Sequence, residues 1–447
     1  MSASKPMDGV SPPLWRLLQQ VAATLQSTLQ GQSLTSRLQN VPSDLRPAVQ
    51  ALSFHVMRQL GCARALRALL APRTPAPAVD ALLCTALALV CDARNAPYTE
   101  HTLVSQCVEA ARRAHTTRAQ AAFINACLRR FLREREALLA QVADDPQARW
   151  NHPLWWIERL QRDHPQHWRY WLEVAQRPAP LTLRVNQRQC TVAQYQQRLQ
   201  AAGLSPGQAV GASGVQLAQA VPVQRLPGFE QGAVSVQDAA AQLAAPLLVR
   251  ELPQRPGLRL LDACAAPGGK TGHLLECCPD AQVLALEIDE RRVRRIHENL
   301  QRLRLNAEVK AADASQPQKW WDGQPFDGIL LDAPCTASGI VRRHPDVRWL
   351  RRPQDSQQLA QVQLQLLQTL WPLLAAGGRL LYCTCSVFRT EGDAVIAAFL
   401  QHNTQARLRP SVGHLTPGSE TVTGDVGDNR LGEHDGFYYA LLEKPAH

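Results

Sequence analysis

The feature that most constrains the fold is a regular alternation of strand and helix patterns in the C-terminal half of the chain. The predicted elements are, in order, a helix at 239–250, a strand at 258–261, a helix at 271–277, a strand at 283–288, a helix at 289–303, strands at 307–310 and 326–332, a helix at 356–374 ended by Gly377 and Gly378, and a strand at 379–384. Such alternation indicates an open, mostly parallel sheet covered by helices. Ligands of these sheets bind beyond the carboxyl ends of the strands.

A glycine-rich turn follows the first of these strands. The apolar run that ends at Leu261 turns at Asp262 and reaches Pro267-Gly268-Gly269 before a helix begins at Thr271. A strand that leads through glycines into a helix presents backbone N–H groups to an anionic or nucleotide-like ligand. The stretch is neither Gly-x4-Gly-Lys-Ser/Thr nor Gly-x-Gly-x-x-Gly. Taken alone, it is equally compatible with a purely structural connection.

Acidic residues stand at the ends of four predicted strands. They are Asp262, Glu287, Asp313 and Asp332. One such residue is commonly a helix N-cap, but four in one domain indicate a binding edge. A carboxylate at Glu287 can accept hydrogen bonds from ribose hydroxyls, and Asp313 could meet an adenine amino group. Both roles suit adenosylmethionine as well as a dinucleotide.

Two cysteines favour adenosylmethionine over a dinucleotide as the cofactor. Cys335, in Asp332-Ala-Pro-Cys-Thr336, and Cys385, in Cys383-Thr-Cys-Ser386, follow two further strands and should share one crevice. A thiolate beside an adenosyl methyl donor indicates methylation at C5 of a pyrimidine. Attack at C6 makes C5 enamine-like, so that it can accept the methyl group before a base removes the C5 proton.

The N-terminal part, residues 1–147, reads as a helical bundle. The chain carries a net charge of +10, concentrated in this part and mostly on arginine. A polyanion such as nucleic acid is the simplest partner for such charge. Arg129, Arg130 and Arg133 lie on one basic face that could contact RNA, and a merely solvated face is the alternative. Residues 148–237 read as a small α+β module, and residues 238–447 as the α/β domain.

The sequence lacks the patterns typical of a membrane span, a signal peptide and a zinc site. No apolar run is long enough to span a membrane, and the first eight residues lack the apolar core of a signal peptide. We therefore expect a cytoplasmic protein. Its 12 cysteines do not form paired Cys-x2-Cys knuckles, so we expect no metal site. Cys383 is predicted to pack inside the sheet.

The combined motifs resemble those of the NOL1/NOP2/Sun family of RNA cytosine-5 methyltransferases. The likeness rests on Ala263-Cys-Ala-Ala-Pro-Gly-Gly-Lys-Thr271, Asp332-Ala-Pro-Cys-Thr-Ala-Ser-Gly339 and Thr384-Cys-Ser386, with further matches at Arg342–Trp349 and His434–Ala440. It covers essentially the whole chain. It implies a NusB-like helical N-terminal domain, a small α+β module that contacts RNA, and a C-terminal Rossmann-like class I methyltransferase domain.

The resemblance also implies a substrate and a role for each motif residue. The substrate would be one cytosine of 16S ribosomal RNA, and we expect no obligate protein partner. Cys385 matches the nucleophile, Cys335 matches the cysteine that assists product release, and Asp332 would contact the cytosine edge as well as the cofactor. Glu287 stands where the family usually has Asp. The residues expected to bind S-adenosylmethionine are Cys264, Ala265, Ala266, Pro267, Gly268, Gly269, Lys270, Glu287, Asp313 and Asp332.

Three basic residues after the Pro-Cys motif, Arg342, Arg343 and Arg348, are expected to contact RNA near the site. Two other functions remain open from the sequence. A non-catalytic RNA-binding assembly factor would explain the charge but not the retained Asp332, Cys335 and Cys385. A DNA methyltransferase would use the Pro-Cys cysteine as its nucleophile, whereas the presence of Thr-Cys-Ser favours the RNA class.

Overall fold

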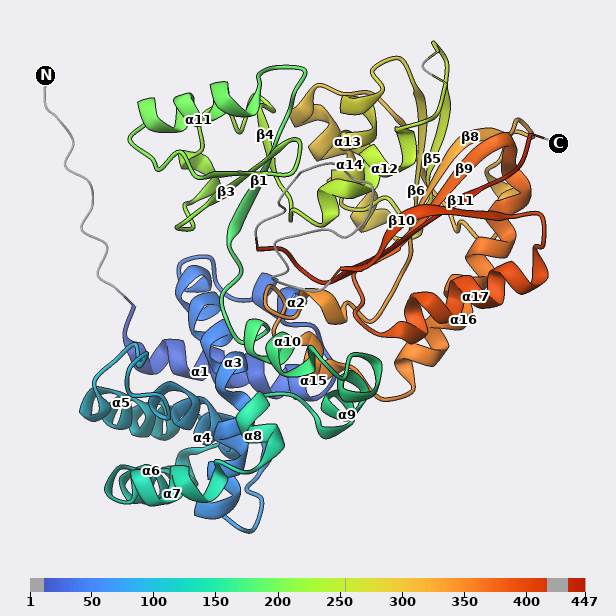
Figure 1. Cartoon of the computed structure of the whole chain (residues 1–447). Helices are drawn as coiled ribbons and strands as arrows, with labels where there is room; N and C mark the ends of the chain where they lie inside the picture. Colours follow the sequence, from blue (N-terminus) through green and yellow to red (C-terminus); the bar gives the residue numbers. More distant parts are fainter. Residues whose placement is uncertain (1–11, 254, 416–432, 447) are drawn as a thin grey trace, which may run out of the picture. The chain divides into compact units, whose positions relative to one another are not determined.

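The computed structural model describes residues 12–253, 255–415 and 433–446, so the expectation drawn from the first eight residues lies outside the described part. The chain divides into two compact units (Figure 1). The helical unit comprises residues 1–177 and 341–351, and the sheet unit comprises residues 178–340 and 352–447. The predicted boundary at 147/148 differs from this division, because the helices between 148 and 177 belong to the helical unit.

The helical unit packs around α4 (Pro77–Val90), which is buried from Ala81 to Val90. Pro77 begins this helix, where its missing N–H is not needed, and an ion pair between Arg67 and Asp80 of 2.8 Å supports the first turn. The other helices of this unit are α1 (Leu14–Leu29), α2 (Leu34–Gln39), α3 (Arg46–Leu70), α5 (Glu100–Arg113), α6 (Ala121–Arg133), α7 (Arg135–Val142), α8 (Pro146–Trp150), α9 (Leu154–Asp163), α10 (Trp168–Val174) and the short α15 (Val347–Leu350).

The segment 341–351 reaches the helical unit from far along the sequence. The carboxylate of Asp346 accepts a hydrogen bond of 2.8 Å from the backbone N–H of Leu34. Trp349 packs against the apolar core of the helical unit. Arg348 is fully buried there and donates to the carbonyl oxygens of Asn151, at 3.2 Å, and Ala175, at 2.8 Å. The segment is therefore a structural part of the helical unit.

The sheet unit contains a seven-stranded sheet of order β10-β11-β9-β8-β5-β6-β7 (Figure 1). The strands β7, β6, β5, β8 and β9 are parallel, and β11 and β10 complete the sheet in antiparallel fashion. The bounds are β5 (Arg259–Asp262), β6 (Gln282–Glu287), β7 (Glu308–Ala311), β8 (Phe326–Asp332), β9 (Leu374–Thr384), β10 (Arg407–Leu415) and β11 (Phe437–Glu443). The predicted parallel α/β domain is therefore present.

Helices cover both faces of this sheet. Leu260 and Leu330 face a core formed with α12 (Ala244–Val249), α13 (Gly269–Cys277) and α14 (Glu290–Leu303). Leu261 and Leu331 face the opposite core, formed with α16 (Asp355–Leu370) and α17 (Asp393–His402). This division follows from the two-residue period of strands, which sends successive side chains to opposite faces.

One predicted helix end is wrong. Gly377 and Gly378 do not cap the long helix, because α16 ends at Leu370 and both glycines lie within β9. There Gly377 donates its N–H to the carbonyl of Lys444 at 2.8 Å, and Lys444 donates to the carbonyl of Gly378 at 3.0 Å. The glycines therefore extend the sheet instead of ending the helix.

A four-stranded antiparallel sheet of order β2-β3-β1-β4 begins the sheet unit. Its strands are β1 (Leu181–Val185), β2 (Gln208–Val210), β3 (Gly214–Leu217) and β4 (Val234–Val236), with α11 (Val192–Ala201) beside them. Arg184 joins it to the larger sheet. Its buried guanidinium forms two hydrogen bonds with Glu276 of α13, at 2.7 and 3.0 Å, and one with the carbonyl of Gly269, at 2.7 Å.

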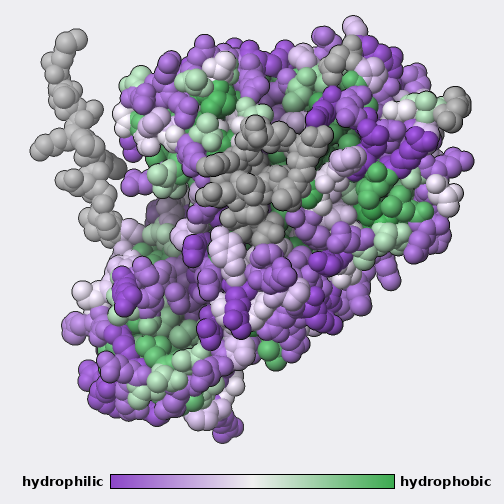
Figure 2. Space-filling view, viewed as in Figure 1, coloured by the Kyte–Doolittle hydropathy of each residue, from purple (hydrophilic) through white to green (hydrophobic). Residues whose placement is uncertain are grey.

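The view in Figure 2 is mainly hydrophilic, with small apolar patches. Large apolar side chains with substantial exposure are few among the described residues, and Ile288, at 69% exposure, stands out. No helix within the described ranges combines the length and the apolar character that a membrane span needs.

Asp262 is the last residue of β5, and its side chain is completely buried. Removal from water raises its pKa to about 7, although Thr271 donates a hydrogen bond of 2.7 Å to Oδ2. Burial disfavours the charged form of a carboxyl group. The folded protein therefore holds a proton on Asp262 at pH values where the unfolded chain has released it.

We predict that breaking the Arg184–Glu276 pair destabilises the protein strongly. Arg184→Met leaves a carboxylate buried without its partner, which should cost about 3–5 kcal/mol of unfolding free energy. As a matched control, Asp322→Asn breaks the more exposed Arg259–Asp322 pair and should cost about 1 kcal/mol or less. Urea unfolding of the full chain, followed by circular dichroism, measures both. Equal losses in the two variants would contradict the prediction.

We also predict a pH-dependent effect of Asp262→Asn. The stabilising effect of the proton on Asp262 is fully present below the ordinary pKa of a carboxyl group and disappears as the pH rises through about 7. The melting temperature of Asp262→Asn relative to wild type should therefore increase between about pH 5 and pH 8. A difference that stays constant over this range would show that Asp262 does not bind the proton.

Candidate functional site

The turn between β5 and α13 forms a rigid cradle at the carboxyl end of β5. Gly268 has φ of +94°, and a Cβ atom there would lie 3.2 Å from the backbone of Ile296. Glycine is therefore required both by the left-handed backbone and by the approach of α14. The same helix fixes the turn, since Asn299 donates to the carbonyl of Pro267 at 2.7 Å and Arg292 to that of Ala266 at 3.1 Å. The cradle residues expected from the sequence lie together here.

Glu287 ends β6, the strand next to this cradle. Its carboxylate is 3% exposed. Oε1 accepts the backbone N–H of Asp289 at 3.1 Å, and Oε2 lies 3.1 Å from the guanidinium of Arg292. These contacts hold a charged carboxylate in place and leave lone pairs on Oε2 for further donors.

The carboxylate of Asp313 follows β7, the next strand. Oδ1 accepts the N–H and the hydroxyl of Ser315, at 2.9 and 2.7 Å, and Oδ2 accepts the amide of Gln316, at 2.8 Å. Although burial opposes the charge, these hydrogen bonds hold the pKa of Asp313 below its ordinary value. A carboxylate has about four lone-pair sites, so these three donors leave about one for a further hydrogen bond.

Asp332 and Lys270 form a half-buried ion pair at the end of β8. The Nζ–Oδ2 distance is 2.6 Å. Burial works against the Lys270 ammonium, yet the negative charge of Asp332 and the hydrogen bond to it raise the pKa of Lys270 overall. Lys270 also lies over the ring of Phe437, 5.4 Å from its centroid.

The Sγ atoms of Cys335 and Cys385 lie 3.4 Å apart. Cys335 follows β8 and Cys385 follows β9, and the two strands pair in parallel with Asp332 opposite Cys383. The hydrogen bond with Cys385, together with burial, raises the pKa of Cys335 well above its ordinary value. The thiol of Cys335 therefore keeps its proton at neutral pH.

Two further cysteines near this edge, Cys383 and Cys264, have thiols in less favourable surroundings for a nucleophile than those of Cys335 and Cys385. Cys383 is completely buried in the sheet, as expected from its strand pattern, and its Sγ lies 3.5 Å from Oδ1 of Asp332. Cys264 lies in the cradle, where burial and the nearby carboxylates raise the pKa of its thiol. Burial and neighbouring negative charge both disfavour a thiolate, so neither position suits a nucleophile.

Two features of this edge were not found from the sequence. Ile288, directly after Glu287, leaves a large apolar side chain exposed to solvent. Glu391 is completely buried and bonds to Thr336 and Ser386, the residues that follow the paired cysteines. No local pattern marks Glu391 in the sequence, since Thr336 precedes it by 55 positions.

The expected RNA-contact residues fall into two classes. Arg129, Arg130 and Arg133 on α6 are exposed, although Glu134 partly neutralises Arg130 at 2.9 Å. Arg343 is partly exposed, whereas Arg342 and Arg348 are buried. Burial lowers the pKa of Arg348 to about 9, and its hydrogen bonds go to backbone carbonyls. The expectation of direct RNA contact is therefore corrected for Arg342 and Arg348.

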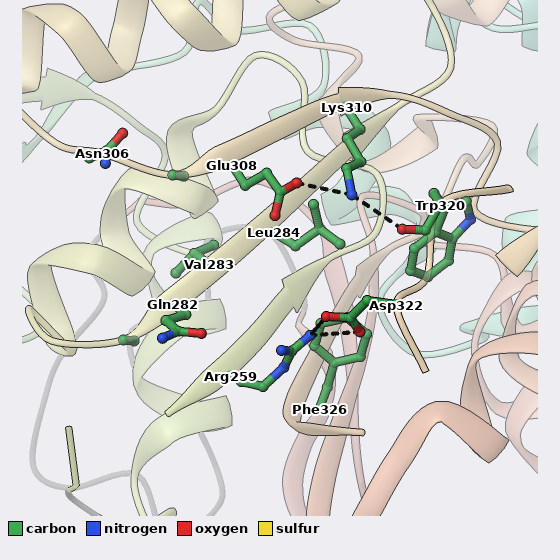
Figure 3. Close-up of a pocket in the computed structure, with 12 residues that line it drawn as sticks. Arg259, Gln282, Val283, Leu284, Asn306, Glu308, Lys310, Trp320, Asp322 and Phe326 are labelled. Atoms are coloured by element: carbon green, nitrogen blue, oxygen red, sulfur yellow. Dashed lines mark hydrogen bonds and ion pairs between the residues drawn. The ribbon is translucent and has the colours of Figure 1, made fainter. Parts of the chain in front are cut away.

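A cavity of about 450 Å³ lies elsewhere in the sheet unit (Figure 3). Its lining includes Arg259, Gln282, Glu308 and Phe326, which stand at the beginnings of four strands. The cavity is therefore at the amino ends of the strands, opposite the acidic and cysteine residues. Its charges are paired with each other, Arg259 with Asp322 and Lys310 with Glu308 (Figure 3).

Comparisons with known proteins place the chain among ribosomal RNA methyltransferases. Residues 250–443 match the family described as 16S rRNA methyltransferase RsmB/F, and residues 152–224 match the ferredoxin-like domain of RsmF/B-like methyltransferases. The chain is 44% identical over 345 residues to Ribosomal RNA small subunit methyltransferase B of Vibrio cholerae, a match that covers 77% of both chains. It is 45% identical over 323 residues to the protein of that name from Escherichia coli, a match that covers 72% of both.

Solved structures share the fold. The crystal structure of PH0851 aligns with a TM-score of 0.74 at 22% identity and covers 99% of this chain and 100% of its own. A methyltransferase homolog protein from Pyrococcus horikoshii aligns with a TM-score of 0.55 at 26% identity and covers 67% of this chain and 98% of its own. Given the family match and the extent of the identities to the two bacterial relatives, the chain belongs to the RsmB/F family of 16S rRNA methyltransferases.

Proposed function

We propose that this enzyme methylates C5 of a cytosine in 16S ribosomal RNA, with S-adenosylmethionine as methyl donor and a covalent bond between Cys385 and C6 of the base. The observation that carries the proposal is the pair of thiols 3.4 Å apart, at the ends of two adjacent strands. The Asp332–Lys270 ion pair ends the first of these strands.

The residues at the strand ends fit a nucleoside methyl donor. The Oε2 atom of Glu287 has lone pairs for ribose hydroxyls, and Asp313 has one open acceptor site for an adenine amino group. Ile288 offers an exposed apolar side chain to a purine ring. In this proposal, the residues from Cys264 to Lys270 form the wall of the cofactor site, and the cofactor supplies an electrophilic methyl group.

The raised pKa of the Cys335 thiol supports a role for it as a hydrogen-bond donor to Cys385. Cys335 keeps its proton because of its contact with Cys385 and its burial. It can therefore donate that proton toward Cys385 and stabilise a thiolate there. The ammonium of Lys270 adds a positive charge nearby. This arrangement favours Cys385 as the nucleophile.

The reaction then proceeds through groups of this chain. The Cys385 thiolate bonds to C6, and the electron pair of the C5–C6 bond becomes available at C5 for the methyl group. Asp332 is placed to accept hydrogen bonds from the amino edge of the base and to stabilise charge there. After transfer, a base takes the C5 proton, the electron pair of the C5–H bond restores the C5–C6 double bond, and the C6–S bond breaks to release the Cys385 thiolate. Cys335 assists this release.

The proposal includes the substrate and its delivery. A base inside folded RNA must be unstacked before it reaches this edge. The exposed arginines of α6 would bind phosphates and position the RNA without choosing the base. A NusB-like character of the helical unit and a cytoplasmic site of action are parts of the same proposal.

We predict opposite effects of the two cysteine substitutions. Cys385→Ala should abolish methyl transfer to 16S RNA, since no thiolate can then activate C5. Cys335→Ala should transfer the methyl group but retain a covalent protein–RNA adduct, visible on a denaturing gel. Bisulfite mapping with tritiated methyl transfer measures product and position. Cys277→Ala, which removes a thiol outside the site, is the control and should behave as wild type.

Activity that survives in Cys385→Ala would contradict its role as nucleophile. Cys335→Ala that turns over without an adduct would contradict the release role. Failure of the wild-type protein to bind adenosylmethionine in calorimetry would contradict the proposed cofactor.

We predict that the exposed arginines of α6 contribute to RNA affinity through phosphates. The triple variant Arg129→Ala, Arg130→Ala and Arg133→Ala should bind 16S RNA more weakly. The slope of log affinity against log salt should decrease by up to about 0.9 for each phosphate that the variant no longer binds. Filter binding at several salt concentrations measures this slope. An unchanged slope would identify α6 as a solvated face that does not bind RNA.

A further inference from the structure

Building on the proposed roles of the two cysteines, we propose that the buried carboxylate of Glu391 is a positioning residue that sets the spacing of Cys335 and Cys385. Glu391 ends the short helix η7 (Arg389–Glu391), between β9 and α17. Its side chain is completely buried. Its hydrogen bonds go to the residues that follow the two thiols, so its effect on the thiols passes through these neighbours.

The carboxylate of Glu391 joins the two cysteine loops directly. Its Oε2 accepts hydrogen bonds from the hydroxyls of Thr336 and Ser386, both 2.5 Å long. Its Oε1 accepts the backbone N–H of Thr336 at 2.8 Å. Thr336 follows Cys335 and Ser386 follows Cys385, so one carboxylate ties down the residue next to each thiol.

Further hydrogen bonds extend this connection between the loops. The hydroxyls of Ser338 and Ser386 lie 2.9 Å apart, and Ser338 accepts the N–H of Val387 at 2.9 Å. The N–H of Gly339 donates to the carbonyl of Cys385 at 2.8 Å. Within this loop, Ala337 has a φ of +59°, which is unusual for a residue other than glycine. The surrounding contacts hold it in that conformation.

Gln363 of α16 and Tyr382 of β9 hold Glu391 in place through hydrogen bonds. Gln363 of α16 donates its amide N–H to Oε1 at 3.2 Å. The hydroxyl of Tyr382 donates to the backbone carbonyl of Glu391 at 2.7 Å, and it also contacts Gln363 at 3.0 Å. The carboxylate therefore has a fixed position relative to β9 and α16, from which it can fix the two loops.

The chemistry of this position favours a carboxylate. Four donors converge on two oxygen atoms, and a carboxylate supplies about four acceptor sites and no donor. A glutamine amide would replace one acceptor oxygen with a donor group facing other donors. Burial raises the pKa of Glu391, and the hydrogen bonds from Ser386 and Thr336 oppose that rise. Without the carboxylate, the donors of both loops would be left buried and unsatisfied, and the two loops would lose the link that Glu391 provides between them.

The test measures the spacing of the thiols without RNA or methyl donor. Diamide oxidises two adjacent thiols to a disulfide and is itself reduced to the hydrazine, taking up the two electrons and two protons. After quenching by alkylation, mass spectrometry of the linked Cys335–Cys385 peptide gives the rate of coupling. Glu391→Gln should slow this coupling and lower kcat by about 10- to 100-fold, since small displacements of reacting groups have effects of this size. The KM for adenosylmethionine should change little.

Three further variants separate positioning from general stability. Glu391→Asp keeps the charge and should restore part of the coupling rate. Ser386→Ala removes one hydroxyl and should give an intermediate rate; it keeps the test decisive if Glu391→Gln does not fold. Glu276→Gln alters another buried carboxylate, far from the thiols in sequence and bonded to Arg184. It should destabilise the protein and leave the coupling rate within about twofold of wild type.

Coupling at the wild-type rate in Glu391→Gln and Ser386→Ala would overturn the proposal, as would a wild-type protein that does not form this disulfide. Equal slowing in Glu276→Gln would also overturn it, because the effect would then be one of stability. Persistence of methyl transfer in Cys385→Ala would instead refute the proposed function, and the coupling rates would still decide the role of Glu391.

Discussion

The candidate site depends on one constraint, which is that parallel strands bring their carboxyl ends to the same edge of a sheet. Asp262 pairs with Leu330 of β8 on one side and Ala285 of β6 on the other. Asp332 in turn lies opposite Cys383 of β9. Asp262 and Leu330, 68 positions apart, and Asp332 and Cys383, 51 positions apart, therefore meet because of the strand order, and no separate contact is needed for each pair. The cavity of Figure 3 lies at the other edge, where its charged residues only neutralise one another.

Burial at this edge gives similar side chains different chemical states. Asp262 is completely buried and its pKa rises to about 7, whereas Asp313, with three hydrogen-bond donors around it, has a lowered pKa. Cys335 likewise retains its proton through its contact with Cys385. Desolvation and the number of donors, more than residue type, decide which groups carry charge here.

The sequence predicted much of this arrangement, and its failures have physical causes. The alternation of strands and helices located the parallel sheet, because that signal is local. The acidic residues predicted at strand ends do lie at the carboxyl ends of these strands, and their role in binding stays a prediction. Glu391 was missed because its partners Thr336 and Ser386 meet it only in the folded protein. Arg348 was assigned to an RNA surface because charge normally indicates exposure. Carbonyl oxygens of the helical unit instead bind its guanidinium in the interior.

The segment 341–351 has a consequence for how this protein can be divided. The chain leaves the sheet unit after Ile340, contributes α15 to the helical unit, and returns at Arg352. A cut at residue 177 would remove from the helical unit a segment that contains a buried arginine and a packed tryptophan. It would leave the same segment on the sheet unit without the residues that bury it. Each unit is therefore built from two separate stretches of the sequence. Neither unit can be expressed alone, or replaced by a homologous domain, unless the segment that follows Cys335 is also redesigned.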